Sequence, residues 1–315
     1  MKKLNHCWVF ADSINGHEIQ SLALAAKITN CVTIFHCGIR QPWLSFAPRV
    51  LPRFGKNIIW KQQKPDINNA PDIIITCGRR MAAVGKYYTR QTGCKHVQIL
   101  NPGDSLKKYD VLVCPEHDNL TAANVIASKG SLHNISISSL TQTKTHCPNY
   151  FKASKIVSLL LGNPAKSFFK DLDKISTKIN QHFPAHKLIV CGSRRTPERY
   201  YSTIKQSFPS AKLVWLTDDD GNNPYKCLLA CSDVLIISAD SINMVSEACA
   251  TDKTVIAIGQ QHISPKHQKF INSVNSRLST YSNYQKVNQP LVVLSEVASK
   301  VVHMLKNRPV HLPPV

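Results

Sequence analysis

Short apolar runs alternate with segments in which apolar residues recur at helical spacing along most of the 315-residue chain. The clearest such unit spans residues 233–251. Its apolar run, Val234–Ile237, ends in small polar residues, and Met244, Val245 and Ala248 then follow at the spacing of one helix face. This pattern predicts a strand, a turn and a helix.

The same unit recurs in both halves of the chain. Strands are expected at residues 6–11, 31–37, 73–76, 96–100 and 109–114, then at 157–162, 187–191, 211–217, 234–237 and 254–259, and a last amphipathic helix at 291–305. Strands that alternate with helices form parallel sheets covered on both faces. We therefore predict the α/β class, with two Rossmann-like domains whose parallel sheets face a cleft.

A polar stretch at residues 141–148 interrupts this alternation. Polar segments that break a regular pattern are typical of linkers between domains. We place the domain boundary there, which gives domains at residues 1–148 and 149–315, each long enough to bury its own core.

The composition is that of a soluble globular protein, with 43% hydrophobic and 18% charged residues. No apolar run has the length needed to cross a bilayer, and the first residues contain only a short apolar segment. We expect a cytoplasmic protein. The absence of an Arg-rich and Ser-rich transit segment favours a bacterial source.

The eleven cysteines are scattered and mostly lie in or beside apolar runs. The nearest pair, Cys227 and Cys231, has no matching second pair of the kind that binds zinc. Buried, reduced thiols explain the cysteines better than disulfides or a metal site. We therefore expect no metal and no bound cofactor.

Lysine and arginine outnumber the acidic residues by 39 to 19, and the net charge is +20. Such a charge favours nucleic acid, an anionic membrane surface or a phosphate-rich ligand as partner. The charges are spread along the chain without a nucleic-acid-binding motif, so nucleic acid is the least favoured of these partners. The alternative is a generally basic, solvated surface.

Polar residues that follow the apolar run of residues 234–237 are candidates for a binding site. Ligands of parallel α/β sheets collect at the carboxyl ends of strands, where the next helix offers unpaired N–H groups. Asp240, Asn243 and Glu247 are spaced so that all three can face one crevice. The alternative is a capped helix with a solvated glutamate.

The second candidate site is the segment Gly192–Thr196, which follows a buried strand. Its small residues, its hydroxyls and the guanidinium groups of Arg194 and Arg195 suit a diphosphate. The alternative is a helix start with surface arginines. The chain lacks the phosphate loop of ATPases, the glycine fingerprint of nicotinamide enzymes, and the serine-hydrolase and zinc-protease motifs.

Loops of the first half carry a further set of polar residues at predicted strand ends. They are Asp12, Gly16, His17 and Glu18, then Gly78, Arg79 and Arg80, and finally His117 and Asp118. Two arginines at a helix start are unfavourable for the helix dipole unless they contact a negative group. We take these residues as candidates for the side of the site that binds a second substrate.

Seven segments, in order, resemble one known family. They are NGHEIQSLALA, CGRRMAA, YDVLVCPEHD, LLLGNPAKSF, GSRRTP, NPYKCLLACSD and ADSINMVSEACAT, and they span about residues 8–275. The chain is identified by them as a member of the mitochondrial fission Elm family, which in turn resembles GT-B glycosyltransferases. That resemblance implies an acceptor-side first domain and a nucleotide-sugar-binding second domain.

Carried onto this sequence, the family motif SRRT falls on Ser193–Thr196, and its second motif on Asp240, Ser241, Met244 and Glu247. The resemblance implies that Glu247 accepts hydrogen bonds from ribose hydroxyls. It implies that N–H groups near Ser241, with Arg194 or Arg195, hold the diphosphate. Asn223, Tyr225 and Asn243 complete the implied nucleotide-sugar site.

The family's first loop is matched except at Ser13, where a glycine is usual. No catalytic base follows from the resemblance. His17, Asp12 and His117 are candidates, because an inverting transfer needs a group that takes the proton of the acceptor hydroxyl. An N-capping aspartate and hydrogen-bonded core histidines are the alternative.

The sequence thus predicts a metal-independent, inverting transfer of sugar from a nucleotide-diphosphate sugar. Its basic surface would suit an acceptor at an anionic membrane, with the protein peripheral at the inner face. The alternative is a non-catalytic adaptor on the same fold, as the role of plant members in recruiting a division dynamin implies. The sugar, nucleotide, acceptor and oligomeric state are not assigned by the sequence.

Overall fold

The computed structural model describes residues 3–49, 55–152, 155–283 and 289–307. The chain forms two compact units. Unit 1 comprises residues 1–134 and 293–315, and unit 2 comprises residues 135–292. Both are α/β, with sheets dominated by parallel strands, as the pattern of apolar residues predicts.

The division differs from the predicted one at both ends of the second domain. Residues 141–146 belong to helix α4 (Ile137–His146), which starts at a capping box formed by Ser136 and Ser139 and packs on α8 (Tyr225–Cys231). Helix α11 (Leu294–Lys306) packs on unit 1. The unit boundary therefore lies before α4, and the chain returns to its first unit at the end.

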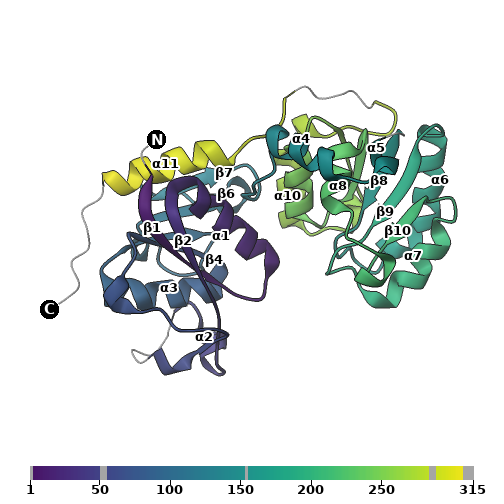
Figure 1. Ribbon diagram of the computed structural model, residues 1–315. Coiled ribbons are helices and arrows are strands. Elements are labelled where there is room, and N and C mark those ends of the chain that lie inside the picture. Colours follow the sequence, from purple (N-terminus) through teal and green to yellow (C-terminus); the bar gives the residue numbers. More distant parts are fainter. Residues whose placement is uncertain (1–2, 50–54, 153–154, 284–288, 308–315) are drawn as a thin grey trace. The chain divides into compact units, whose positions relative to one another are not determined.

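Unit 1 contains a seven-stranded sheet with the order β3-β2-β1-β4-β5-β6-β7 (Figure 1). Its strands are β1 (Leu4–Ala11), β2 (Thr29–Ile39), β3 (Ile58–Trp60), β4 (Ile73–Cys77), β5 (Lys95–Ile99), β6 (Val111–Pro115) and β7 (Val125–Ser128). All pairs are parallel except β2 with β3 at the edge. The edge strand β3 is an addition to the predicted set, as is β7.

Helices cover both faces of this sheet. Helix α1 (Asn15–Ile28) and helix α11 pack on one face, while α3 (Gly78–Thr92) and the short α2 (Trp43–Phe46) lie on the other. Successive strand residues face opposite cores, since Val9 packs on the α1 side whereas Trp8 and Phe10 pack on the α3 side. Burial on both faces is why these strands read as continuous apolar runs.

Unit 2 contains a five-stranded parallel sheet with the order β10-β9-β8-β11-β12. Its strands are β8 (Ile156–Leu160), β9 (Lys187–Cys191), β10 (Leu213–Trp215), β11 (Val234–Ser238) and β12 (Thr254–Ile258). Its other helices are α5 (Asn149–Lys152), α6 (Leu172–His182), α7 (Tyr201–Ser207), α9 (Ile242–Cys249) and α10 (Pro265–Ser273).

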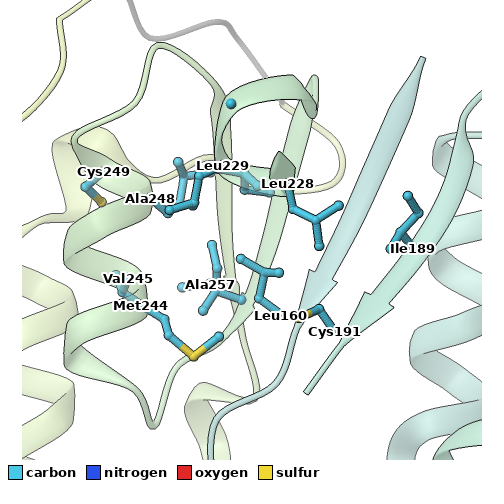
Figure 2. Packing of buried hydrophobic residues seen from close by; sticks show 14 of the residues in the cluster. Leu160, Ile189, Cys191, Leu228, Leu229, Met244, Val245, Ala248, Cys249 and Ala257 are labelled. Atoms are coloured by element: carbon cyan, nitrogen blue, oxygen red, sulfur yellow. The ribbon is translucent and has the colours of Figure 1, made fainter. Parts of the chain in front are cut away.

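The larger core of unit 2 lies between its sheet and helices α8, α9 and α10. Figure 2 shows Met244, Val245 and Ala248 of α9 in one core with Leu228 and Leu229 of α8 and Leu160 of β8. Helices α6 and α7 cover the opposite face. Helix α9 is therefore fixed along its whole length by buried contacts, and its first turn is held at the carboxyl end of β11.

The strand order reverses once in each sheet. In unit 1, the chain runs outward from β1 in one direction and from β4 in the other. In unit 2, the same reversal lies between β8 and β11. Ligands of open parallel sheets bind at such reversal points, outside the carboxyl ends of the strands.

One prediction about the cysteines is wrong. The structure joins Cys147, at the end of α4, to Cys227 in α8 through a disulfide with Cα atoms 5.7 Å apart. The two residues lie 80 positions apart in the sequence, so their spacing gave no sign of the pair. The other nine cysteines form no disulfide with a described residue, and most are buried as expected. Burial raises the pKa of Cys37 and Cys191 to about 12, so these two thiols are inert.

Candidate functional site

Three loops of unit 2 meet at Gly162, directly after β8. Its carbonyl oxygen accepts hydrogen bonds from Thr196 Oγ1 at 2.7 Å and from Ser193 Oγ at 3.2 Å, both in the loop after β9. Its amide donates to Ser238 Oγ at 2.8 Å, at the end of β11. The residues predicted from two separate motifs are thus brought together at the strand reversal.

Asp240 approaches the same point from the turn after β11. Its Oδ2 accepts from the amide of Asn163 at 2.7 Å, while its Oδ1 is buried and has no hydrogen-bond partner among the described residues. A Cβ atom on Gly162 would lie 2.6 Å from Asp240 Oδ2. Glycine is therefore required there by the close approach of two loops. Neither Gly162 nor Asn163 was a predicted site residue, although both lie within the GN segment of a family-like motif.

The loop after β9 holds its own shape through its hydroxyl groups. Thr196 is buried, and its Oγ1 accepts from the amide of Ser193 at 2.8 Å, while Ser193 Oγ accepts from the amide of Arg195 at 3.2 Å. The loop leads into a short 3₁₀ turn at Glu198–Tyr200 before α7. Ser193 and Thr196 therefore shape the loop, and α7 begins only after that turn, at Tyr201.

The two arginines of this loop keep their side chains exposed. Neither Arg194 nor Arg195 forms an ion pair with any residue in the described part of the chain. Guanidinium groups on a fixed loop at a strand reversal are suited to phosphate oxygens. The predicted diphosphate role thus rests on the two arginines rather than on the hydroxyls.

Helix α9 begins beside this loop. Ser241 is its N-cap residue and is buried, but its side chain makes no capping hydrogen bond, so the first N–H groups of the helix lack that partner. Asn243 is half-buried in the first turn. Met244 belongs to the hydrophobic core, where Figure 2 places it against the sheet. Met244 thus anchors the helix in the core, whereas Ser241 and Asn243 lie at its N-terminal end.

Glu247 lies in the second turn of α9 and is only 9% exposed. Its Oε2 accepts a hydrogen bond from the hydroxyl of Tyr225 at the start of α8. Burial raises the pKa of Glu247, and the bond from Tyr225 opposes that rise. Asn223 Oδ1 accepts from the amide of Tyr225 at 2.9 Å. The predicted group of Asn223, Tyr225 and Glu247 is therefore a connected hydrogen-bonded unit.

His267 of α10 is a site residue that the sequence did not reveal. Asp240 and Arg195 both act on its pKa, which burial lowers, so its imidazole shares their surroundings. Its Nδ1 lies 2.9 Å from Ser264 Oγ at the N-cap of the same helix. The residues around it, Ser264 and Pro265, mark a helix start, but nothing in the sequence ties that helix to the reversal point.

In unit 1, Asp12 and His17 lie at the carboxyl end of β1. Asp12 is buried, and its Oδ1 lies 3.4 Å from His17 Nδ1 and accepts from the amide of Ile14 at 3.0 Å. The imidazole packs directly on Gly78, the first residue of α3. Gly78 has φ +77°, and a Cβ atom there would lie 2.6 Å from the ring. Asp12, His17 and Gly78 therefore form one compact group at the reversal of this sheet.

The remaining first-half candidates are dispersed. Glu18 Oε2 lies 3.3 Å from Nε2 of His36 on β2, a residue that was not predicted. His117 lies near Asp118, with Nε2 and Oδ1 3.8 Å apart, at the end of β6. Because β4 and β5 separate β6 from β1, the sheet keeps His117 apart from His17.

Three further candidates of unit 1 make only local contacts or are exposed. Arg79 donates to the carbonyl of Ala47 at 3.4 Å, Arg80 is exposed, and the carbonyl of Gly16 accepts from Gln20. The carbonyl of Ala47 is the negative group that the helix start at Arg79 requires. These contacts serve local structure.

A family model for mitochondrial fission ELM1 matches residues 15–305. The chain belongs to this family. Among its relatives is an uncharacterized Rickettsia prowazekii protein, RP120, which is 25% identical over an alignment that covers 95% of each chain. The mitochondrial fission protein ELM1 of Arabidopsis thaliana is 25% identical over 76% of this chain and 65% of its own length.

Solved structures similar to this ELM1 family member share its fold. A UDP-N-acetylglucosamine 2-epimerase of Neisseria meningitidis bound to UDP-GlcNAc aligns with a TM-score of 0.55 and 11% identity, covering 97% of this chain and 100% of the enzyme. A Listeria monocytogenes protein described as a UDP-N-acetylglucosamine 2-epimerase aligns with a TM-score of 0.57 and 10% identity, covering 97% and 96%. The fold of the ELM1 family member is thus GT-B-like, as its motifs predict.

A cavity of about 460 Å³ opens in unit 2, beside the carboxyl end of β12. It is lined by Phe168, Lys174, Lys178, Gly259 and Tyr281, among others, and includes neither Glu247 nor the two arginines. The described part of the chain contains no group of three or more residues that could hold a metal ion. None of its described helices is long and apolar enough to span a membrane.

Proposed function

We propose that unit 2 binds a nucleotide-diphosphate sugar and that the protein transfers the sugar to an acceptor hydroxyl. The convergence of three loops on Gly162 carries this proposal. The loop that carries the exposed Arg194 and Arg195 is bound at Gly162, which also lies next to Ser241 at the start of α9. Guanidinium groups and helix N–H groups are the donors that a diphosphate requires.

The two ends of the nucleotide are assigned to different residues. Arg194 and Arg195 would hold the diphosphate together with the N–H groups that follow Ser241. Glu247, whose carboxylate is buried and ionisable, would accept hydrogen bonds from the ribose. The similarity of fold to an epimerase bound to UDP-GlcNAc supports a nucleotide sugar as the ligand, although it establishes only the fold.

The transfer step requires a base for the acceptor hydroxyl, and His17 is our candidate. The Asp12 carboxylate, 3.4 Å from His17 Nδ1, would stabilise the imidazolium formed when Nε2 takes the proton. The guanidinium groups would carry the charge of the departing diphosphate, so the proposed reaction uses no resident metal or other cofactor. The net charge of +20 supports an acceptor at an anionic membrane, with the protein on its cytoplasmic side.

A thermal-shift screen of UDP-, GDP- and ADP-sugars tests ligand binding directly. A ligand present at a hundred times its Kd should stabilise the protein by about 2.7 kcal/mol. Arg195→Ala and Glu247→Gln should each weaken binding by about tenfold or more, because each removes a charged partner. Arg90→Ala removes an exposed arginine of unit 1 and should leave the shift unchanged.

Turnover is measured separately, as release of the nucleoside diphosphate in the presence of membrane lipid. His17→Ala should abolish release while leaving the thermal shift intact. If no nucleotide sugar stabilises the wild-type protein at millimolar concentration, the proposal is wrong, and the adaptor alternative gains support. Binding without any release would contradict the transfer step alone.

A further inference from the structure

The carboxylate of Glu247 has a single hydrogen-bond partner among the described residues. That partner is the hydroxyl of Tyr225, which donates to Oε2. Glu247 Oε1 receives no donor from the described part of the chain. The carboxylate therefore has one oxygen bound by the protein and one available to a ligand.

Tyr225 is held in place from three directions. Its amide donates to Asn223 Oδ1, and its ring packs against the core under α8 and α9. Two residues further along α8, the disulfide of Cys227 ties the helix to Cys147 at the end of α4. If a ligand displaced the hydroxyl from Glu247, a buried O–H group would lose its acceptor, which is costly. We therefore expect the Tyr225 hydroxyl to keep its hydrogen bond to Oε2 when a ligand binds.

We propose that Tyr225 is a positioning residue of the nucleotide site, whose hydroxyl holds Oε2 of the buried Glu247 carboxylate and directs its second oxygen to the ribose. This inference rests on the proposed nucleotide binding. It assigns Tyr225 a role through Glu247 rather than a contact with the sugar. The ribose is then recognised by one carboxylate oxygen, Oε1.

The groups around Glu247 determine how its charge depends on pH. Burial has the largest effect and raises its pKa. The hydrogen bond from Tyr225 and the positive charge of Lys226, both on α8, lower it. Cys191, at the end of β9, lies near Tyr225, and burial keeps its thiol neutral. Tyr225→Phe removes the hydrogen bond that lowers the pKa of Glu247, so this pKa rises further. A protonated Glu247 is a poor acceptor for ribose.

The test is the affinity for UDP-N-acetylglucosamine, measured by calorimetry across a pH series for wild type, Tyr225→Phe and Glu247→Gln. This probe is chosen because its diphosphate is doubly esterified and does not titrate near neutral pH. We expect Tyr225→Phe to bind about tenfold more weakly at neutral pH. Its affinity should recover as the pH rises, so that its binding midpoint lies at higher pH than that of wild type.

Tyr281→Phe is the matched control. Tyr281 is a tyrosine of the same unit whose buried hydroxyl has no hydrogen-bond partner in the described part of the chain, so its removal should leave the pH profile unchanged. Glu247→Gln should bind weakly at every pH and show no midpoint.

The outcomes separate this inference from the proposed function. If wild type binds the probe, Glu247→Gln weakens binding and a folded Tyr225→Phe keeps the wild-type pH profile, then the positioning role is wrong and the nucleotide site stands. If wild type binds no probe at any pH, the proposed function fails and the role of Tyr225 fails with it. Should Tyr225→Phe not fold, Asn223→Ala, which loosens the same tyrosine through its backbone, must shift the midpoint in the same direction.

Discussion

At the scale of single residues, Gly78 shows how backbone and site depend on each other. The residue adopts φ +77°, a conformation in which a side chain is strained, and the imidazole of His17 occupies the space of a Cβ atom. The histidine that we assign as the base is therefore packed against the backbone of Gly78. The position of His17 thus depends on a glycine that has no side chain to take part in a reaction.

We expect Gly78→Ala to lower the free energy of unfolding of unit 1 by about 2–4 kcal/mol, because it combines a left-handed backbone with overpacking against His17. Urea denaturation followed by tryptophan fluorescence measures the change. Gly38→Ala is the matched control, since a Cβ atom there meets nothing within 4 Å, and it should leave stability unchanged or slightly higher. Equal effects of the two substitutions would contradict the contact with His17.

Residues 193–196 show how far a motif can be interpreted without a structure. The sequence predicts two guanidinium groups and two hydroxyls for a diphosphate, and the arginines are indeed exposed. The hydroxyls instead bind the carbonyl of Gly162, more than thirty residues away. A sequence does not reveal which polar groups are used by such distant backbone partners. The nucleotide role of the arginines stays a prediction.

At the scale of elements, the sequence is most informative where strands are buried on both faces. The runs at residues 234–237 and 254–259 became β11 and β12 almost unchanged, because parallel strands need apolar residues throughout. The three-residue β3 is too short to form a pattern. Helix α4 has only Leu140 buried and so lacks an apolar face that a sequence pattern could reveal.

Helix α4 is held by a covalent bond instead of a broad apolar face. We expect Cys147→Ser with Cys227→Ser to lower the free energy of unfolding by about 2–4 kcal/mol in the absence of reductant, because the disulfide limits the unfolded chain. The measurement is urea denaturation with and without a phosphine reductant. Reductant should destabilise wild type and leave the double variant unchanged.

Cys31→Ser, at an exposed free cysteine, is the control and should behave as wild type does. A count of eleven reactive thiols in the denatured, unreduced protein would show that the Cys147–Cys227 bond does not form under those conditions.

At the scale of the whole molecule, the last helix belongs with the first strands. The sequence predicts α11 correctly as an amphipathic helix but assigns it to the second domain, because it follows that domain in the chain. Its apolar face packs with α1 and with strands of the first sheet. Amphipathic spacing shows that a face will be buried, but it does not show against which core.

This placement predicts a long-range effect of a substitution near the end of the chain. Leu305 is 3% exposed within the core of unit 1, so Leu305→Ala should cost about 2–5 kcal/mol there. Hydrogen exchange should then become faster in β1, β4 and α1, and remain unchanged in β8 and β11 of unit 2. Lys300→Ala, on the exposed face of the same helix, should change neither unit. Faster exchange confined to unit 2 would restore the domain assignment made from sequence and contradict the packing of α11.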